Sequence, residues 1–160
     1  MLVYLGLGGN TGDRESNLEE ALGRLDAVAG IQVVRASSFY DTAPVGPPQP
    51  RFLNAVCAVE TTLSPEELLD AIHRIENDMG RRRNADDRWG PRSIDIDLLF
   101  YGDRVIDGER LTVPHRQAHK REFVLRPMAE IAPDFMHPVI HRTMADMLED
   151  ITRDDDHDRR

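Results

Sequence analysis

The chain has 160 residues, 40% hydrophobic and 31% charged, a composition typical of a single globular domain. Its net charge of -9 argues against a general nucleic-acid binder, because phosphate contacts require a basic surface. The first residues carry no basic targeting region, and no apolar run reaches the roughly 18 residues that a membrane span needs. The sequence therefore predicts a cytoplasmic protein that contacts neither nucleic acid nor membrane.

The N-terminal residues predict a strand followed by a helix. Residues 3–7 are an apolar run typical of a short strand, and the glycine-rich residues 8–13 predict the turn that ends it. From Arg14 to Val28 apolar side chains recur with the helical period, and Gly30 predicts the stop.

Two more strands are predicted on either side of a proline-rich loop. Residues 31–40 have the composition of a strand. Residues 41–50 contain four prolines, which remove backbone donors and exclude a regular element. Residues 54–62 are apolar on both faces, so we expect this strand to be central, with Cys57 as a small buried side chain.

The second predicted helix begins with a capping box. Ser64 is the expected N-cap, Pro65 suits the first helical position, and Glu67 stands where it can bond back to the cap. The apolar period continues to Met79. Residues 81–93 then form a basic loop with five arginines.

The remaining elements are short. Residues 105–106 and 111–113 predict extended pieces, and residues 123–131 and 144–148 predict helices. Residues 151–160 are rich in aspartate and predict a disordered acidic tail.

The order of the predicted elements indicates the fold class. Strand, helix, strand, strand, helix, strand matches the split βαβ arrangement of a ferredoxin-like core. We therefore expect an α+β fold in one domain, residues 1–150, with strand ends and loops available for a site.

The stretch RSIDIDLLF, residues 92–100, carries the main chemical signal. Successive strand side chains point to opposite faces, so the side chains of this stretch should form two sets, one on each face of the sheet. One set faces the core and comprises Ile94, Ile96, Leu98 and Phe100; the other comprises Asp95, Asp97 and Leu99. The two carboxylates would lie about 6.6 Å apart, and like charges that close require a cation.

Magnesium and a polyphosphate satisfy this requirement together. Mg²⁺ prefers one or two carboxylates with waters and substrate phosphates, and arginine binds phosphate oxygens bidentately. The arginines of residues 81–92 lie next to the pair in sequence. The alternative without a bound ligand is that Asp95 and Asp97 form salt bridges on a solvent-exposed face. Trp89 could likewise be partly buried and not stack on a base.

These residues resemble the 6-hydroxymethyl-7,8-dihydropterin pyrophosphokinase family of folate biosynthesis. The likeness spans roughly residues 1–150 with its motifs in family order. Those motifs are residues 6–10, 38–42, 44–47, 53–55, 66–69, 88–99, 110–115, 121–123 and 130–133.

The resemblance implies a monomeric, three-layer α/β/α ferredoxin-like fold with a mainly antiparallel central sheet. It implies transfer of diphosphate from ATP, the co-substrate, to the hydroxymethyl group of 6-hydroxymethyl-7,8-dihydropterin, with release of AMP. Two Mg²⁺ ions per ATP would be held by Asp95 and Asp97.

The resemblance also assigns site residues. The catalytic set would be Arg81, Arg83, Arg92, Asp95 and Asp97, with Arg81 and Arg83 in a lid. The ATP-binding set would be Glu76, Arg81, Arg83, Trp89, Arg92, Leu98, Arg110, Thr112, His115 and Arg121. The pterin-binding set would be Thr42, Ala43, Val45, Phe52, Asn54, Trp89, Asp95 and Phe123.

Three positions depart from the family pattern. Phe52 stands where the family often has tyrosine, and Arg116 replaces a usual aromatic residue. The segment between Arg83 and Arg88 is one residue longer than in the family pattern.

Two other classes of function fit parts of the sequence. Asp-x-Asp on a strand also suits a nucleotidyltransferase, which would leave AMP on the acceptor. Arginines around Trp89 also suit an RNA-binding module, although the acidic whole disfavours it.

Overall fold

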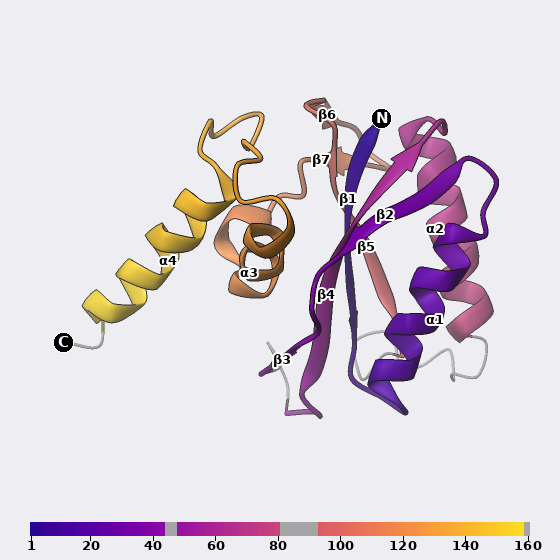
Figure 1. Cartoon of the computed structure of the whole chain (residues 1–160), viewed down its shortest axis with the longest axis horizontal. Coiled ribbons are helices and arrows are strands. Elements are labelled where there is room, and N and C mark those ends of the chain that lie inside the picture. Colours follow the sequence, from indigo (N-terminus) through magenta and orange to yellow (C-terminus); the bar gives the residue numbers. More distant parts are fainter. Residues whose placement is uncertain (44–47, 81–92, 159–160) are drawn as a thin grey trace.

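The computed structural model describes residues 1–43, 48–80 and 93–158, with side chains to residue 153. Three layers are visible in Figure 1. Helices α1 (Arg14–Asp26) and α2 (Pro65–Gly80) cover one face of a central sheet. Helices α3 (Glu122–Ile131) and α4 (Met144–Asp158) lie on the other side, with α3 against the sheet. No helix in the described ranges is both long and apolar enough to cross a membrane.

The sheet has the strand order of a ferredoxin-like fold. Its strands are β1 (Leu2–Gly9), β2 (Ile31–Ala36), β3 (Tyr40–Thr42), β4 (Phe52–Thr61) and β5 (Asp95–Tyr101). The order is β2-β4-β1-β5, every pairing is antiparallel, and β3 also pairs with β4. This confirms the predicted fold class and the central place of residues 54–62.

Three short elements follow β5. Strands β6 (Ile106–Asp107) and β7 (Thr112–Val113) form a separate antiparallel pair. A 3-10 helix, Ala118–Lys120, then leads into α3.

The sheet separates two hydrophobic cores. On β1, Val3, Leu5 and Leu7 face α1 and α2, whereas Tyr4 faces α3 and α4. Cys57 of β4 is fully buried in the first core, and burial raises the pKa of its thiol to about 12. This confirms its predicted role as a small core side chain.

A β-bulge in β5 changes the predicted alternation. Tyr4 lies opposite Phe100 and Leu5 lies opposite Leu98, which leaves Leu99 as an extra residue in β5. Leu99 and Phe100 therefore both enter the second core. The prediction that Phe100 shares a face with Leu98 is wrong, because the bulge shifts the period after Leu98.

The helix start signals are confirmed. The Ser64 N–H donates to Glu67 Oε1 at 2.9 Å, and the Glu67 N–H donates to Ser64 Oγ at 3.2 Å. Asp13 caps α1 by accepting from the Ser16 N–H at 3.1 Å. Gly30, which follows α1, has a φ of 90°, a conformation that favours glycine.

Two predicted elements differ in extent. Residues 31–40 form β2 and the start of β3, with a break at Ser37, where the Val56 N–H donates to the side-chain Oγ at 2.9 Å. Helix α4 continues to Asp158 where the sequence predicts an end at residue 148 and then disorder. An Arg153–Glu149 ion pair one turn apart supports the added length. The domain boundary at residue 150 stays a prediction.

A buried histidine lies in the loop between α3 and α4. His137 is only 4% exposed, and its Nδ1 atom accepts from the N–H groups of Val139 and Ile140, both at 3.1 Å. Burial lowers the pKa of His137 below its usual 6.5, and His119 and His141 lower it further. Folding therefore favours the neutral imidazole.

We expect the free energy of unfolding to decrease as the pH falls below 6.5. The unfolded chain takes up a proton at His137 near that pH, whereas the folded chain resists it. The stabilisation is thus complete above the unfolded pKa and is lost as the pH falls toward the lower folded pKa. Urea unfolding at about pH 7.5 and about pH 5.5 measures this loss, and it should shrink in His137→Asn, which keeps an acceptor without titrating.

The exposed His73 on α2 provides the control. His73→Asn should retain the wild-type dependence of stability on pH. An identical loss of stability in wild type and His137→Asn would contradict the assignment.

Candidate active site

Glycines on β1 create a hollow in the sheet on the α3 side. In the strand register, Gly8 lies between Asn54 of β4 and Asp95 of β5. A methyl group at Gly8 would come within 2.7 Å of Asn54 Oδ1, so a larger residue does not fit without a shift. The hollow is the floor of a cavity of about 430 Å³, a size typical of small-molecule sites.

Two carboxylates of β5 line this cavity. Asp95 and Asp97 lie on its side of the sheet, whereas Ile96 between them is 5% exposed and belongs to the first core. This confirms the predicted shared face of the two aspartates. Gly6 lies opposite Asp97 and adds no side chain beside it. Two like charges on one open face favour a bound cation.

Glu76 of α2 contacts the same strand from the opposite face. Its Oε2 atom accepts a hydrogen bond from the Ile96 N–H at 3.0 Å. That N–H belongs to the residue between the two aspartates. Glu76, predicted to lie near the nucleotide, is therefore bonded to the backbone of β5 and does not line the cavity.

Four of the eight predicted pterin-binding residues line the cavity from neighbouring parts of the sheet. Thr42, Ala43, Phe52 and Asn54 all line it, from β3, β4 and the segment between them. The Asn54 amide donates to the Thr42 hydroxyl, which fixes both side chains. Polar hydrogen-bonding groups thus stand beside the apolar ring of Phe52.

Sequence reasoning missed Gln49 as a lining residue. Gln49 Oε1 accepts from the Nδ2 atom of Asn10 at 2.8 Å, and the same Nδ2 donates to the Pro50 carbonyl at 3.0 Å. Asn10 is only 2% exposed. No periodic signal marks Gln49, since it lies in a proline-rich loop. The one available hint was an asparagine, Asn10, directly after the glycines at the end of β1.

The first turn of α3 supplies the wall facing the sheet. Arg121, Phe123 and Val124 all line the cavity. The Arg121 guanidinium carbon lies 5.4 Å from the centroid of the Phe123 ring, within cation–π range. The predicted phosphate-binding arginine and the predicted pterin-stacking ring are therefore neighbours.

Arg110, predicted to bind ATP, contacts α2 instead of the cavity. It forms an ion pair with Asp70, and its Nη1 atom lies 3.7 Å from Glu66 Oε2. The guanidinium is about half exposed, so it can exchange these partners for a phosphate at modest cost.

Three other predicted nucleotide residues lie around β5. The His115 N–H donates to the Leu99 carbonyl at 3.0 Å, and His115 Nδ1 accepts from the Gln117 N–H at 3.2 Å. Thr112 is part of β7, and the Leu98 side chain is buried in the first core, so Leu98 offers a ligand only its backbone.

Five predicted site residues lie outside the described residues and stay predictions. They are Val45, Arg81, Arg83, Trp89 and Arg92.

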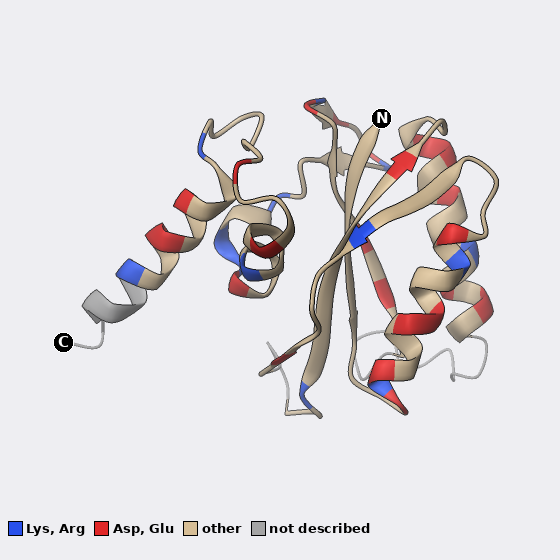
Figure 2. Ribbon diagram, in the orientation of Figure 1, with Lys and Arg blue, Asp and Glu red and all other residues tan. Residues whose placement is uncertain are grey.

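The carboxylate pair suits magnesium better than a closed metal site. In the part of the chain that the structure describes, no three His, Cys, Asp or Glu side chains gather to hold a metal. Two carboxylates are enough for Mg²⁺, which completes its shell with water and phosphate oxygens. Figure 2 shows these acidic positions on β5, and further acidic residues on α1 and α2.

Comparison with known proteins identifies the family. A family profile described as "7,8-dihydro-6-hydroxymethylpterin-pyrophosphokinase (HPPK)" matches residues 4–133. The chain is 46% identical over 149 residues to a Synechocystis 2-amino-4-hydroxy-6-hydroxymethyldihydropteridine pyrophosphokinase, covering 93% of this chain and 75% of that protein. A Haemophilus influenzae protein of the same name is 46% identical over 137 residues, 85% of this chain and 84% of its own length.

A solved structure supports the fold. A Plasmodium falciparum HPPK-DHPS crystal structure with pterin and p-hydroxybenzoate superposes with a TM-score of 0.75 at 17% identity. The superposition covers 98% of this chain and 44% of that one. With most of its length matched by the family profile, this chain belongs to the 7,8-dihydro-6-hydroxymethylpterin-pyrophosphokinase family.

Proposed function

We propose that this chain transfers diphosphate from ATP to the hydroxymethyl group of 6-hydroxymethyl-7,8-dihydropterin. The substrate hydroxyl oxygen attacks the β-phosphorus and gives up its proton to solvent, the bond from that phosphorus to the α-phosphate oxygen breaks, and AMP leaves. One observation carries the proposal: a single cavity is lined at one side by Asp95 and Asp97 and at another by Thr42, Asn54 and Phe123.

The residues around Asn54 suit a flat heterocycle with polar edges. The Phe123 ring supplies an apolar face on which such a ring can stack. Asn54 and Thr42 supply hydrogen-bonding atoms. By the resemblance, Phe52 stands where the family often has tyrosine, so the site keeps the ring without the hydroxyl. Val45 and Trp89 belong to this proposed set by resemblance.

The carboxylates suit the phosphate end. Asp95 and Asp97 would hold the magnesium ions, two for each ATP, whose charge offsets the charge that develops on the transferred phosphates. Arg121 lines the same cavity and adds positive charge there. Arg81, Arg83 and Arg92 are proposed partners of the phosphates, with Arg81 and Arg83 in the lid.

Transfer of this kind depends on positioning and charge more than on covalent help from the protein. The backbone of β5 is held by α2, because the Glu76 carboxylate accepts from the Ile96 N–H between the two aspartates. A fixed β5 backbone keeps the positions of the two aspartates constant relative to each other. A monomeric state and a cytoplasmic location remain predictions.

The direct test is to mix the protein with ATP, Mg²⁺ and 6-hydroxymethyl-7,8-dihydropterin. We expect AMP and a pterin that has gained two phosphates, identified by mass spectrometry, with no AMP when pterin is omitted. A pterin carrying AMP would instead establish a nucleotidyltransferase.

We expect Asp97→Ala to lower kcat/KM by at least about a hundredfold, since the metal ions depend on the carboxylate pair. The melting temperature without metal should stay the same or rise, because removing one of two like charges relieves repulsion. Asp103, exposed in the turn after β5, provides the control, and Asp103→Ala should keep wild-type turnover. Undiminished Mg²⁺-dependent turnover in Asp97→Ala would overturn the assignment.

Gly8→Ala should weaken pterin binding, because the new methyl group would displace the Asn54 amide. We expect the KM for pterin to rise about tenfold or more, which corresponds to about 1.4 kcal/mol. Gly23→Ala is the matched control: Gly23 lies in α1, and apart from the adjoining residues and backbone of that helix no atom lies within 4 Å of an added methyl group. That variant should gain roughly 0.5–1 kcal/mol of stability and keep its kinetics. Equal KM values for wild type and Gly8→Ala would refute the close approach to Asn54.

A further inference from the structure

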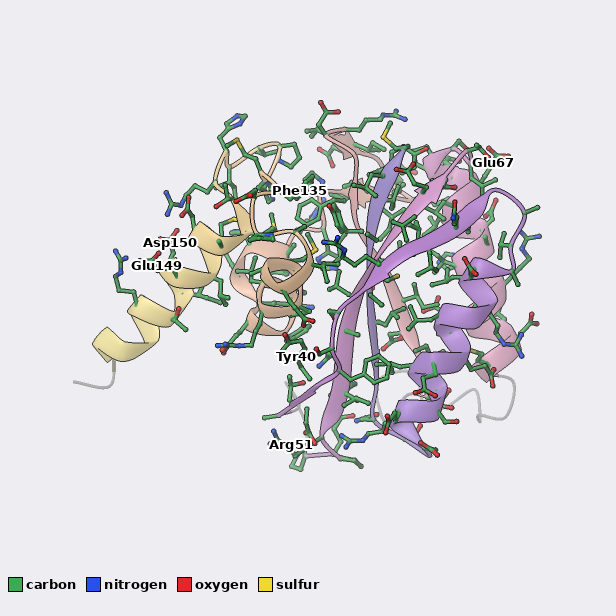
Figure 3. All side chains as sticks on the ribbon, in the orientation of Figure 1. Tyr40, Arg51, Glu67, Phe135, Glu149 and Asp150 are labelled. Carbon is green, nitrogen blue, oxygen red and sulfur yellow. The ribbon has the colours of Figure 1, made fainter. Side chains whose placement is uncertain are left out.

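One carboxylate at the end of α3 gathers several donors from the segment that leads into β3. Glu130 accepts from the Ser38 N–H at 3.0 Å to each carboxylate oxygen, and from Ser38 Oγ at 2.9 Å. The Tyr40 hydroxyl donates to Glu130 Oε1 at 2.5 Å. Figure 3 labels Tyr40, the first residue of β3. The Glu130 side chain thus joins the end of α3 to residues 38–40 by hydrogen bonds.

The two elements joined by Glu130 form different parts of the cavity. Helix α3 carries Phe123 at the wall, about 10 Å from Glu130 at 1.5 Å per residue along the helix. Strand β3 carries Thr42, which accepts from the Asn54 amide on the floor. Glu130 itself does not line the cavity.

The segment before β3 is also tied to β4 and to the end of α3. The Ser37 N–H donates to the Val56 carbonyl at 2.8 Å, and the Val56 N–H donates to Ser37 Oγ at 2.9 Å. Arg35 Nη1 donates to the Ile131 carbonyl at 2.9 Å. Residues 35–40 therefore connect the strand of the floor to the helix of the wall.

The protonation states match these bonds. Although burial raises the pKa of Glu130, hydrogen bonds from Tyr40 and Ser38 outweigh it and lower the pKa below its usual value. Burial and the Glu130 carboxylate raise the pKa of Tyr40 to about 12. At neutral pH the carboxylate is therefore ionised and the phenol keeps the proton it donates.

We propose that Glu130 is a positioning residue for the pterin end of the cavity: by holding residues 38–40 against α3, it sets the separation between the Phe123 wall and the floor that carries Thr42 and Asn54. This inference rests on the proposed function for its ligand. It assigns Glu130 no contact with substrate.

Glu130→Gln tests the proposal, because glutamine keeps the size of the side chain but turns one acceptor oxygen into an amide donor facing other donors. We expect the KM for 6-hydroxymethyl-7,8-dihydropterin to rise about fivefold to tenfold, with kcat and the KM for ATP within about twofold of wild type. A purely structural role would reduce the amount of active enzyme, and so lower kcat without raising that KM.

Asp150→Asn is the matched control. Asp150 is also an exposed carboxylate, and it accepts from Arg142 at 2.7 and 2.9 Å, but it lies on α4 and does not contact β3. Figure 3 shows it on that helix, away from β3. This variant should keep the wild-type KM for pterin even if its melting temperature falls.

A double-mutant cycle separates the hydrogen bond from the ring of Tyr40. Tyr40→Phe removes the hydroxyl and keeps the ring, and should raise the KM for pterin by a smaller factor than Glu130→Gln. In the Glu130→Gln background it should cause little further change, since its partner is already altered. Fully additive effects would contradict a shared interaction.

A comparison of amide NMR spectra tests the positioning without turnover. Glu130→Gln should shift the Thr42 and Phe123 amide resonances, whereas Asp150→Asn should not. Shifts confined to residues 38–40 and 128–131, or an unchanged KM for pterin, would overturn the inference. If wild type makes no AMP from ATP and pterin, the proposed function fails, and the NMR comparison still decides whether Glu130 sets the spacing.

Discussion

The site depends on the pairing of two glycines in β1 with two aspartates in β5. Gly6 lies opposite Asp97 and Gly8 lies opposite Asp95, so β1 has no side chain beside either carboxylate on that face. A sheet face normally buries its side chains against a helix. Here the missing side chains leave space beneath α3, and the carboxylates can face that space without being sealed from water. The cavity therefore results from the register between β1 and β5, which places glycines beside the two aspartates.

The sequence predicts this floor well because the period of a strand is short and local. Asp95 and Asp97 share a face, as their spacing predicts, and Ile96 is buried on the other. The prediction fails at Phe100, because a bulge depends on the partner strand and leaves no mark in local periodicity. Side-chain alternation is thus reliable only as far as the pairing stays regular.

Contacts that are distant in sequence are the part that local patterns could not supply. Glu130 bonds Ser38 and Tyr40 across roughly ninety positions, and Gln49 in the proline-rich loop accepts from Asn10 across 39 positions. Family resemblance placed several of these residues within motifs but gave them no contacts. The capping box of α2 shows the opposite case, since Ser64 and Glu67 are three residues apart and the pattern names both partners.

The sheet that forms the floor packs against both cores, whereas the helix that forms the wall packs only in the second core. The floor is held from the first core side, where Glu76 bonds the β5 backbone between the aspartates. The wall belongs to the second core, in which the rings of Tyr4, Phe100 and Phe135 meet at centroid distances of 4.9 to 6.4 Å. Loss of packing in the second core would therefore change the separation of wall and floor, while the first core still supports the sheet. Glu130 opposes that change, because its carboxylate joins α3 directly to Ser38 and Tyr40 at the edge of the floor. The first turn of α3 and strand β3 line the same small cavity, so this connection acts where the separation matters.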